Sequence, residues 1–230
     1  MTDQVSTQER ASRLRVLADE AANCTRCGLS SGRTNVVFGY GDPDADLMIV
    51  GEGPGQHEDE QGLPFVGRSG QLLDQLLGEI DLTRDHNVYI GNVVKCRPPG
   101  NRDPRQEEID TCKSYLREQL RLVDPKVVVT LGNFSSKLLL RTETGISKLR
   151  GRAYEWWGRF LVPTFHPAAA LRGSASVLEA MRSDLELVAD IVAGRLRLEE
   201  PTVPPRTEPE PASEPSAVAE PVADQLGLFR

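Results

Sequence analysis

The stretch LMIVGEGPGQHEDEQGLPFVGRSGQLL, residues 47 to 73, holds a strand pattern, a turn-rich loop and a helix pattern in direct succession. Its first four residues are all apolar, which is typical of a strand buried on both faces of a sheet. We expect a helix from about residue 69 to residue 80, where the apolar side chains return at helical spacing. This order of strand, loop and helix is the repeating unit of parallel α/β sheets.

Three later segments repeat the strand pattern, and each again precedes a helix pattern. The strands are expected at 87–94, 126–132 and 159–165, and the helices at 104–123, at 133–140 and from about 178 to 192. Asp103 and Pro104 suit the N-cap and first residue of the second helix. An N-terminal helix should follow Ser6, which has capping-box spacing to Glu9, and stop near Asn23. We therefore predict an α/β fold, a three-layer α/β/α sandwich with a four-stranded parallel central sheet.

Length and composition limit the class of protein. At 230 residues the chain is long enough for one well-packed domain with appendages, and we assign that domain to residues 1–198. Without an apolar stretch that resembles a secretion signal or a membrane span, we expect a soluble cytoplasmic monomer with no membrane partner. In that reducing compartment the four cysteines are expected to be metal ligands or free thiols, not structural disulfides.

Residues 199–230 differ in composition from the rest of the chain. They are rich in proline and glutamate and show no helical or strand period, so we predict a disordered tail. Of the total net charge of −7, this tail accounts for −5, which leaves −2 for residues 1–198. The acidic total therefore does not exclude nucleic-acid binding by a local basic patch.

Ligands of parallel α/β sheets bind beyond the carboxyl ends of the strands, so the segments after the four strands should share one rim. The first segment, 51–67, has five glycines but lacks the Gly-Lys-Ser/Thr ending and the Gly-x-Gly-x-x-Gly spacing of phosphate loops. The others are NVVKCRPPGNRDP from 92, GNFSS from 132 and HPAAALRG from 166. Candidate functional side chains on this rim are Glu52, Glu58, Phe65, Asn92 and His166. Phe65 is either a base-stacking platform or a core plug beneath the loop, and the sequence leaves both open.

Basic side chains gather in three loops beside the rim, which suggests a track for a phosphate backbone. They are Lys95, Arg97, Arg102 and Arg105 in one loop, Lys148, Arg150 and Arg152 in another, and Arg172 in the third.

The cysteines form one Cys-x-x-Cys pair, Cys24 and Cys27, and two single positions, Cys96 and Cys112. A redox dithiol, a zinc site and an iron–sulfur cluster are all open for these thiols, because the spacing alone does not decide between them.

The rim segments GEGPGQHEDEQGLPFVGRSGQLL, NVVKCRPPGNRDP and FHPAAALR, in this order and with four cysteines around them, resemble the family 4 uracil-DNA glycosylases, the iron–sulfur type. The likeness spans about Cys24 to Leu187. It implies a base-excision enzyme that flips uracil out of DNA and hydrolyses its N-glycosidic bond. It also implies a [4Fe-4S] cluster of structural or DNA-orienting role on Cys24, Cys27, Cys96 and Cys112.

The resemblance assigns roles to the rim side chains. Phe65 would stack on the uracil ring, Asn92 would read its N3–H and O4, and His166 would donate a hydrogen bond to O2. Glu52 and Glu58 could hold a water or stabilise the cationic sugar, and Glu58 also lies where the methyl group of thymine would go. The best-known uracil glycosylases have aspartate where this chain has Gly53, so the base is left open between Glu52, Glu58 and neither.

Contacts to DNA follow from the same resemblance. Leu171 and Arg172 are candidates for the wedge that fills the vacated base stack. The phosphate contacts are assigned to Lys95, Arg97, Arg102, Arg150 and Arg172.

Two alternatives remain open. One is a related uracil-DNA binder that becomes covalently trapped on its substrate. Trapping depends on a histidine in the loop after the second strand, and that loop here reads KCRPPGNRDP, without a histidine. The other is a non-catalytic, metal-stapled nucleic-acid-binding module, which would keep the basic patches but would have no use for Asn92 and His166.

The last residues of the chain resemble the short peptide by which bacterial repair and replication proteins dock onto the sliding clamp. This peptide, QLGLF, supplies Gln225, Leu226, Leu228 and Phe229. The 27 residues from 198 to 224 would span roughly 30 Å as a flexible linker. A clamp partner would thereby raise the effective concentration of the enzyme on DNA.

Overall fold

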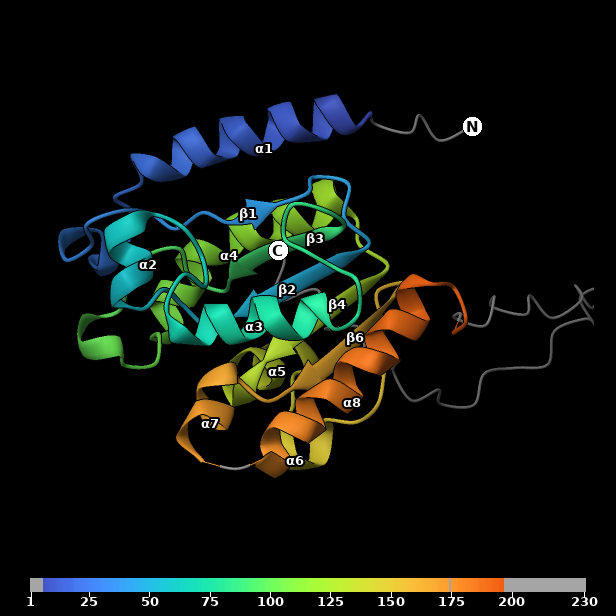
Figure 1. Ribbon diagram of the computed structural model, residues 1–230. Coiled ribbons are helices and arrows are strands. Elements are labelled where there is room, and N and C mark those ends of the chain that lie inside the picture. Colours follow the sequence, from blue (N-terminus) through green and yellow to red (C-terminus); the bar gives the residue numbers. More distant parts are fainter. Residues whose placement is uncertain (1–5, 174, 197–230) are drawn as a thin grey trace, which may run out of the picture.

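The computed structural model describes residues 6–173 and 175–196, which fold around one twisted sheet (Figure 1). The predicted tail at 199–230, the domain boundary at residue 198 and the QLGLF peptide lie outside the described residues. Along the described part of the chain, no helix is long and apolar enough to cross a membrane.

The sheet has six strands in the order β1-β3-β2-β4-β6-β5. The four inner strands are parallel and correspond to the four predicted segments: β2 Leu47–Gly51, β3 Val88–Asn92, β4 Val127–Leu131 and β6 Arg159–Thr164. Two antiparallel edge strands were not predicted, β1 Tyr40–Gly41 and β5 Tyr154–Trp156. Two or three residues are too few to show a strand period.

Helices cover both faces of the sheet, which confirms the three-layer α/β/α sandwich (Figure 1). Side chains alternate between the faces along each inner strand, so Met48 and Val50 belong to one apolar cluster and Leu47 and Ile49 to the other. The first cluster includes side chains of α1 Thr7–Ala22, α4 Gln106–Val123 and α5 Gly132–Leu140. The second includes side chains of α3 Arg68–Gly78 and α8 Ala175–Val192.

Three short helices lie in connections where no helix was predicted: α2 Gln56–Gln61, α6 Ile146–Leu149 and α7 Pro167–Arg172. Two 3₁₀ turns accompany them, Gly28–Ser31 and Pro99–Asn101. Both α2 and α7 are part of loops that follow inner strands, so they shape the rim.

The capping predictions had different outcomes at α1 and α4. Ser6 caps α1 by accepting a hydrogen bond from the Glu9 N–H at 3.2 Å, and this helix ends at Asn23, as predicted. The predicted start of α4 at Pro104 is wrong, because α4 begins at Gln106 with Arg105 as its N-cap. The reason is Glu108, whose carboxylate accepts from the Arg105 N–H at 2.8 Å and fixes the first turn there.

The order of the inner strands reverses at β2, which has β3 on one side and β4 on the other. The loops that leave such a point diverge to opposite sides and open a crevice at the carboxyl ends of the strands. Gly51 ends β2 and pairs in register with Asn92 at the end of β3. The predicted rim therefore lies at this reversal.

Candidate functional site

The main pocket lies at the carboxyl edge of the sheet and has a volume of about 670 Å³. This size is within the range of small-molecule sites, about 300–1,000 Å³. Its walls come from the loops after β2, β3 and β6, which are three of the four predicted rim segments. The fourth segment, GNFSS, forms the first turns of α5 instead, and Gly132 lies against His166, where a Cβ would be 3.2 Å from the His166 Cβ.

Asn92, the last residue of β3, carries an unsatisfied acceptor next to Gly51 and Phe65, and Phe65 lines the pocket. The residue is 1% exposed, and within the described residues its Oδ1 has no hydrogen-bond partner. A buried polar atom without a partner costs about 1–3 kcal/mol, and a ligand that donates to it removes that cost. We therefore expect the ligand of this pocket to carry a hydrogen-bond donor to Asn92 Oδ1.

Gly51 allows Asn92 and Phe65 to meet. A Cβ at position 51 would be 2.3 Å from Asn92 Oδ1 and 2.8 Å from Phe65 Cζ, so a larger residue would displace both side chains. Phe65 is 7% exposed, packs in the second apolar cluster and also lines the pocket. It is therefore a core residue with one surface at the site, and its base-stacking role stays a prediction.

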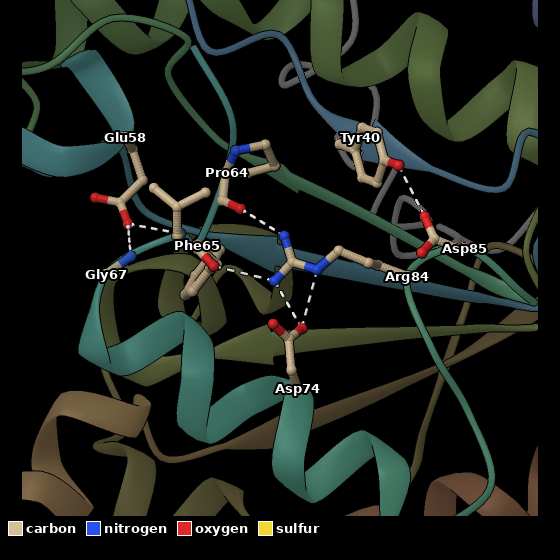
Figure 2. Close-up of polar contacts among 9 residues, drawn as sticks. Tyr40, Glu58, Pro64, Phe65, Gly67, Asp74, Arg84 and Asp85 are labelled. Carbon is tan, nitrogen blue, oxygen red and sulfur yellow. Dashed lines mark hydrogen bonds and ion pairs between the residues drawn. The ribbon is translucent and has the colours of Figure 1, made fainter. Parts of the chain in front are cut away.

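Glu58 supports the Phe65 turn (Figure 2). Its Oε1 accepts hydrogen bonds from the N–H groups of Val66 and Gly67, both at 3.0 Å. A Cβ at Gly55 would be 2.7 Å from the Oε2 atom, so the backbone at Gly55 closely borders the second oxygen. Glu58 lines the pocket, but its carboxylate is engaged in holding the loop.

His166 is held as a neutral hydrogen-bond donor. It is the N-cap of α7, and its Nδ1 accepts from the Ala168 N–H at 3.2 Å, which leaves the proton on Nε2. Burial lowers the pKa of His166 to about 4; the charge of Arg172 adds to this effect and that of Glu58 opposes it. The ring centroid lies 5.8 Å from that of Phe65, and both rings line the pocket.

Glu52 faces a second carboxylate that was not identified as a site residue from the sequence. Burial, the charge of Asp103 and a hydrogen bond with Asp103 together raise the pKa of Glu52 to about 7, with burial as the largest cause. Both side chains line the pocket. Asp103 was predicted only as a helix cap, although its place in a rim loop was a signal that it could serve the site.

The structure changes the predicted phosphate track in two places. Lys95 is 1% exposed, and its Nζ donates to the Asn92 carbonyl at 2.8 Å and to Gln119, so the prediction that Lys95 contacts DNA is wrong. Arg150 forms an ion pair with Asp184 at 2.7 Å and thereby links α6 to α8. We therefore no longer assign Arg150 to the phosphate contacts. A lysine at the end of a strand is usually exposed, but the buried ammonium group of Lys95 has two oxygen acceptors, the Asn92 carbonyl and Gln119 Oε1.

Three of the other basic candidates, Arg97, Arg102 and Arg172, lie at the pocket or in a loop that lines it, whereas Arg105, Lys148 and Arg152 are not among the pocket residues. Arg102 and Arg172 line the pocket, although Arg102 also pairs with Glu108 at 2.6 Å. Arg97 donates to Asn101 at 2.7 Å in the same loop. Leu171 is 41% exposed, which leaves its side chain available to insert into another molecule.

The four cysteines surround a second, smaller pocket. Cys24 and Cys27 follow α1, Cys96 lies in the loop after β3 and Cys112 lies on α4, and all four are free thiols lining this one space. Over the described ranges, no group of three or more histidine, cysteine, aspartate or glutamate side chains is close enough to hold a single metal ion. The sulfurs are thus gathered around a shared space without converging on one point.

Three of these sulfurs accept hydrogen bonds. Arg26 Nε donates to Cys24 Sγ at 3.3 Å, Arg33 Nη1 to Cys96 Sγ at 3.4 Å, and the Lys95 N–H to Cys112 Sγ at 3.3 Å. Such donors stabilise thiolates and tune the metal centres that thiolates hold.

The thiol pKa values reflect the same surroundings. Burial raises the pKa of Cys112 to about 11, against the opposing charge of Lys95. Burial also acts to raise the pKa of Cys24, but hydrogen bonds and charge from Arg26, with a hydrogen bond from Tyr115, outweigh it and lower the pKa overall. Burial therefore favours the neutral thiol at Cys112, whereas the surroundings of Cys24 favour its thiolate more than in a free cysteine.

Comparison with known proteins gives consistent matches over the same region. A model of the uracil DNA glycosylase superfamily matches residues 38–186. The type-4 uracil-DNA glycosylase of Sulfurisphaera tokodaii is 46% identical over 167 residues, which cover 69% of this chain and 76% of the relative. That of Thermotoga maritima is 42% identical and covers 72% and 86%, and that of Saccharolobus solfataricus is 38% identical and covers 79% and 88%.

Proposed function

The chain belongs to the uracil-DNA glycosylase superfamily, and we propose that its rim pocket hydrolyses the N-glycosidic bond of uracil in DNA and leaves an abasic site. The observation that carries this proposal is the buried Oδ1 of Asn92, which has no partner among the described residues and lies next to Phe65 of the pocket wall. A base inside a duplex must first be flipped out of the stack, because no side chain can otherwise reach its glycosidic bond.

Asn92 and Phe65 recognise the flipped base. The Asn92 Oδ1 accepts from uracil N3–H, and its Nδ2 donates to O4, while Phe65 packs against the ring. Cytosine presents the opposite pattern, with an acceptor at N3 and a donor at N4. Each mismatched buried pair costs about 1–3 kcal/mol, so cytosine is rejected.

His166 stabilises the departing base. As the bond between C1′ and N1 breaks, the bonding electrons move onto uracil and negative charge builds on O2. The Nε2–H of His166 donates to that oxygen, and its neutral ring keeps the donor geometry without a proton transfer. A positioned donor of this kind contributes about 10²- to 10³-fold to the rate.

Glu52 is the carboxylate we assign to the attacking water. The water oxygen bonds to C1′ as N1 leaves, and the released proton passes to Glu52, while the ionised form of Glu52 also stabilises the cationic sugar. This choice over Glu58 is supported by the hydrogen bonds that already occupy Glu58 at Val66 and Gly67. The backbone at Gly53 is crowded, since a Cβ there would be 2.9 Å from a Val94 methyl group.

We propose that Cys24, Cys27, Cys96 and Cys112 hold a [4Fe-4S] cluster. A single tetrahedral zinc at about 2.3 Å from each sulfur needs sulfurs about 3.8 Å apart, whereas a cluster keeps them farther apart. The proposal is supported by the four free thiols that line one shared space and by the hydrogen bonds that three of their sulfurs accept. When bound, the cluster supplies a cross-link between three segments of the chain and no electron to the reaction, since hydrolysis transfers none.

DNA contact is assigned to the residues that the fold leaves at the pocket. Arg102 and Arg172 line it and are placed to meet phosphates, with Arg97 in the same loop as Arg102. Exposed Leu171 is the wedge into the vacated stack. The sliding clamp as a partner of residues 225–229, a monomeric state and a cytoplasmic location complete the proposal.

The experiment is release of labelled uracil from single-stranded and double-stranded oligonucleotides that contain one uracil. We expect release by the wild-type protein, and its absence with intact binding would favour the covalently trapped or non-catalytic alternatives. Asn92→Asp removes the donor to O4, so uracil release should fall at least tenfold, from the cost of one lost pair. Asn87→Asp is a matched control at the residue just before β3, because the Asn87 Oδ1 accepts from the Asp46 N–H at 2.6 Å.

A further inference from the structure

Phe65 has an unusual backbone conformation for an aromatic residue. Its φ is +53°, in the left-handed region, where a bulky side chain is disfavoured. Such a conformation persists only where the surrounding structure holds it, and it is found preferentially at functional sites. The question is therefore which groups hold the turn at Phe65.

Arg84 holds the carbonyl side of the turn (Figure 2). Its Nη1 donates to the Pro64 carbonyl at 2.9 Å, and its Nη2 donates to the Phe65 carbonyl at 3.0 Å. The Nε and Nη2 of the same guanidinium both donate to Asp74 Oδ1 on α3, at 2.9 and 2.7 Å. The Arg84 side chain is only 17% exposed and its bonds to the two carbonyls are partly buried, whereas Asp74 is 48% exposed.

The N–H side of the turn is held by a different residue. Glu58 accepts from the Val66 and Gly67 N–H groups, so Arg84 and Glu58 together bind the three peptide units from Pro64 to Gly67, and the unit between Phe65 and Val66 is bound by both. Gly70 makes room for this arrangement, because a Cβ there would be 1.7 Å from the Phe65 carbonyl oxygen.

Arg84 itself is positioned by the connection that leads from α3 into β3. It lies in the connection between α3 and β3, where Thr83 and His86 form an isolated bridge. Its neighbour Asp85 accepts a hydrogen bond from the Tyr40 hydroxyl on β1 at 2.8 Å (Figure 2). Arg84 is thus a fixed group from outside the pocket that reaches the backbone of a residue inside it.

We propose that Arg84 is a positioning residue, which keeps the Phe65 backbone in its left-handed conformation and so presents the Phe65 ring to the flipped base. The inference rests on the proposed function for its catalytic consequence. Arg84 touches neither substrate nor reacting atoms. Without the hydrogen bonds from the Arg84 guanidinium, Phe65 relaxes toward the favoured φ region. The fraction of molecules in which the Phe65 ring forms the pocket wall then falls.

The test uses full-length protein with Arg84→Met and a matched control, Arg182→Met. Arg182 also forms a two-nitrogen ion pair beside the end of α3, with Glu79 at 2.8 and 3.1 Å, but it has no contact with the turn. Arg84→Met should lower single-turnover kcat/KM for uracil release about tenfold, whereas Arg182→Met should leave it within about twofold. Arg84→Lys keeps the charge but cannot span both carbonyls and Asp74, so it should fall between these values.

A double-mutant cycle separates positioning from general stability. In a Phe65→Ala background the ring is absent, so Arg84→Met should cause no further loss of uracil release. An equal tenfold loss in that background would overturn the proposal, because Arg84 would then act on something other than Phe65.

Hydrogen exchange tests, without any uracil substrate, whether Arg84 holds the Phe65 turn. Peptides covering residues 62–70 should exchange faster in Arg84→Met than in Arg182→Met, because the turn opens locally. Equal exchange would overturn the proposal even if wild-type activity is high. Absence of uracil release from the wild type would instead overturn the proposed function, and the exchange result would still decide whether Arg84 holds the turn.

Discussion

The carboxylate pair of Glu52 and Asp103 predicts a specific pH dependence of uracil excision. Burial raises the pKa of Glu52 to about 7 from an ordinary value of 4.5, with Asp103 adding to the shift. If the ionised form of Glu52 receives the proton of the attacking water, the rate should follow its ionisation. The perturbations that test this are Glu52→Gln, which removes the titrating group, and Asp103→Asn, which removes the neighbouring charge.

The magnitude follows from that pKa. A carboxyl group with a pKa of about 7 is about 9% ionised at pH 6 and about 91% ionised at pH 8, so the rate should rise about tenfold over this interval. Asp103→Asn should move the midpoint to lower pH. Because burial is the larger cause of the shift, the midpoint should stay above the ordinary value of 4.5.

The assay is single-turnover uracil release from a short single-stranded oligonucleotide, measured from pH 5.5 to pH 8 with enzyme in excess. Single-turnover conditions exclude product release from the measured rate. His166 does not interfere, because its pKa of about 4 keeps it neutral over this range. Glu52→Gln should be slower and should lack the inflection near pH 7.

Stability provides an independent reading of the same pKa. A folded-state pKa raised above the unfolded value means that the stability contributed by protonated Glu52 is complete below about pH 4.5 and is lost as pH rises through about 7. Glu52→Gln should therefore gain urea resistance relative to wild type as the pH is raised from 5 to 8.

Two results would refute this reasoning. A wild-type profile that is flat between pH 6 and pH 8 would show that Glu52 ionisation does not limit the reaction. An inflection that persists unchanged in Glu52→Gln would assign the titration to another group.

Three further predictions concern the donor, the cysteines and the tail. His166→Ala should lower single-turnover uracil release about 10²- to 10³-fold without weakening DNA binding, and a near-wild-type rate would show that His166 is not the donor. Protein purified without air should be brown, with broad visible absorption that disappears on acid treatment, whereas colourless protein with stoichiometric zinc would contradict the cluster. Deletion of residues 225–229 should abolish binding to the sliding clamp but leave uracil release from short oligonucleotides unchanged; clamp binding that survives the deletion excludes the QLGLF peptide as the docking site.

The inner sheet and the longer helices could be predicted because their signals are local. A run such as KVVVTLG is apolar at successive positions, and this is enough to indicate a strand buried on both faces. The edge strand Tyr154–Trp156 and the helix Gln56–Gln61 carry no comparable period, since each is shorter than the window over which a pattern becomes visible. Their formation depends on the neighbour against which they pack.

The rim could also be predicted, because the carboxyl ends of parallel strands must lie at one edge of a sheet. Phe65, Asn92 and His166 were identified on this basis together with the family resemblance, and the structure brings Phe65 against both of the others. Asp103 was assigned to a helix cap, because Asp-Pro is a common helix start. Glu108 performs that capping role and leaves Asp103 at the pocket beside Glu52.

The sequence by itself determined the order of strands and helices, the edge of the sheet that carries the site and the types of residue on it, because these follow from short-range periodicity and from the geometry of parallel sheets. Only the tertiary structure decided the partners of the polar side chains. Arg84 binds the Phe65 carbonyl from 19 residues away, and Lys95 binds Gln119 from 24 residues away, inside the protein and not at DNA. No local pattern specifies such partners, since a long cationic side chain is equally compatible with water and with any buried oxygen that the folded backbone brings within hydrogen-bond distance.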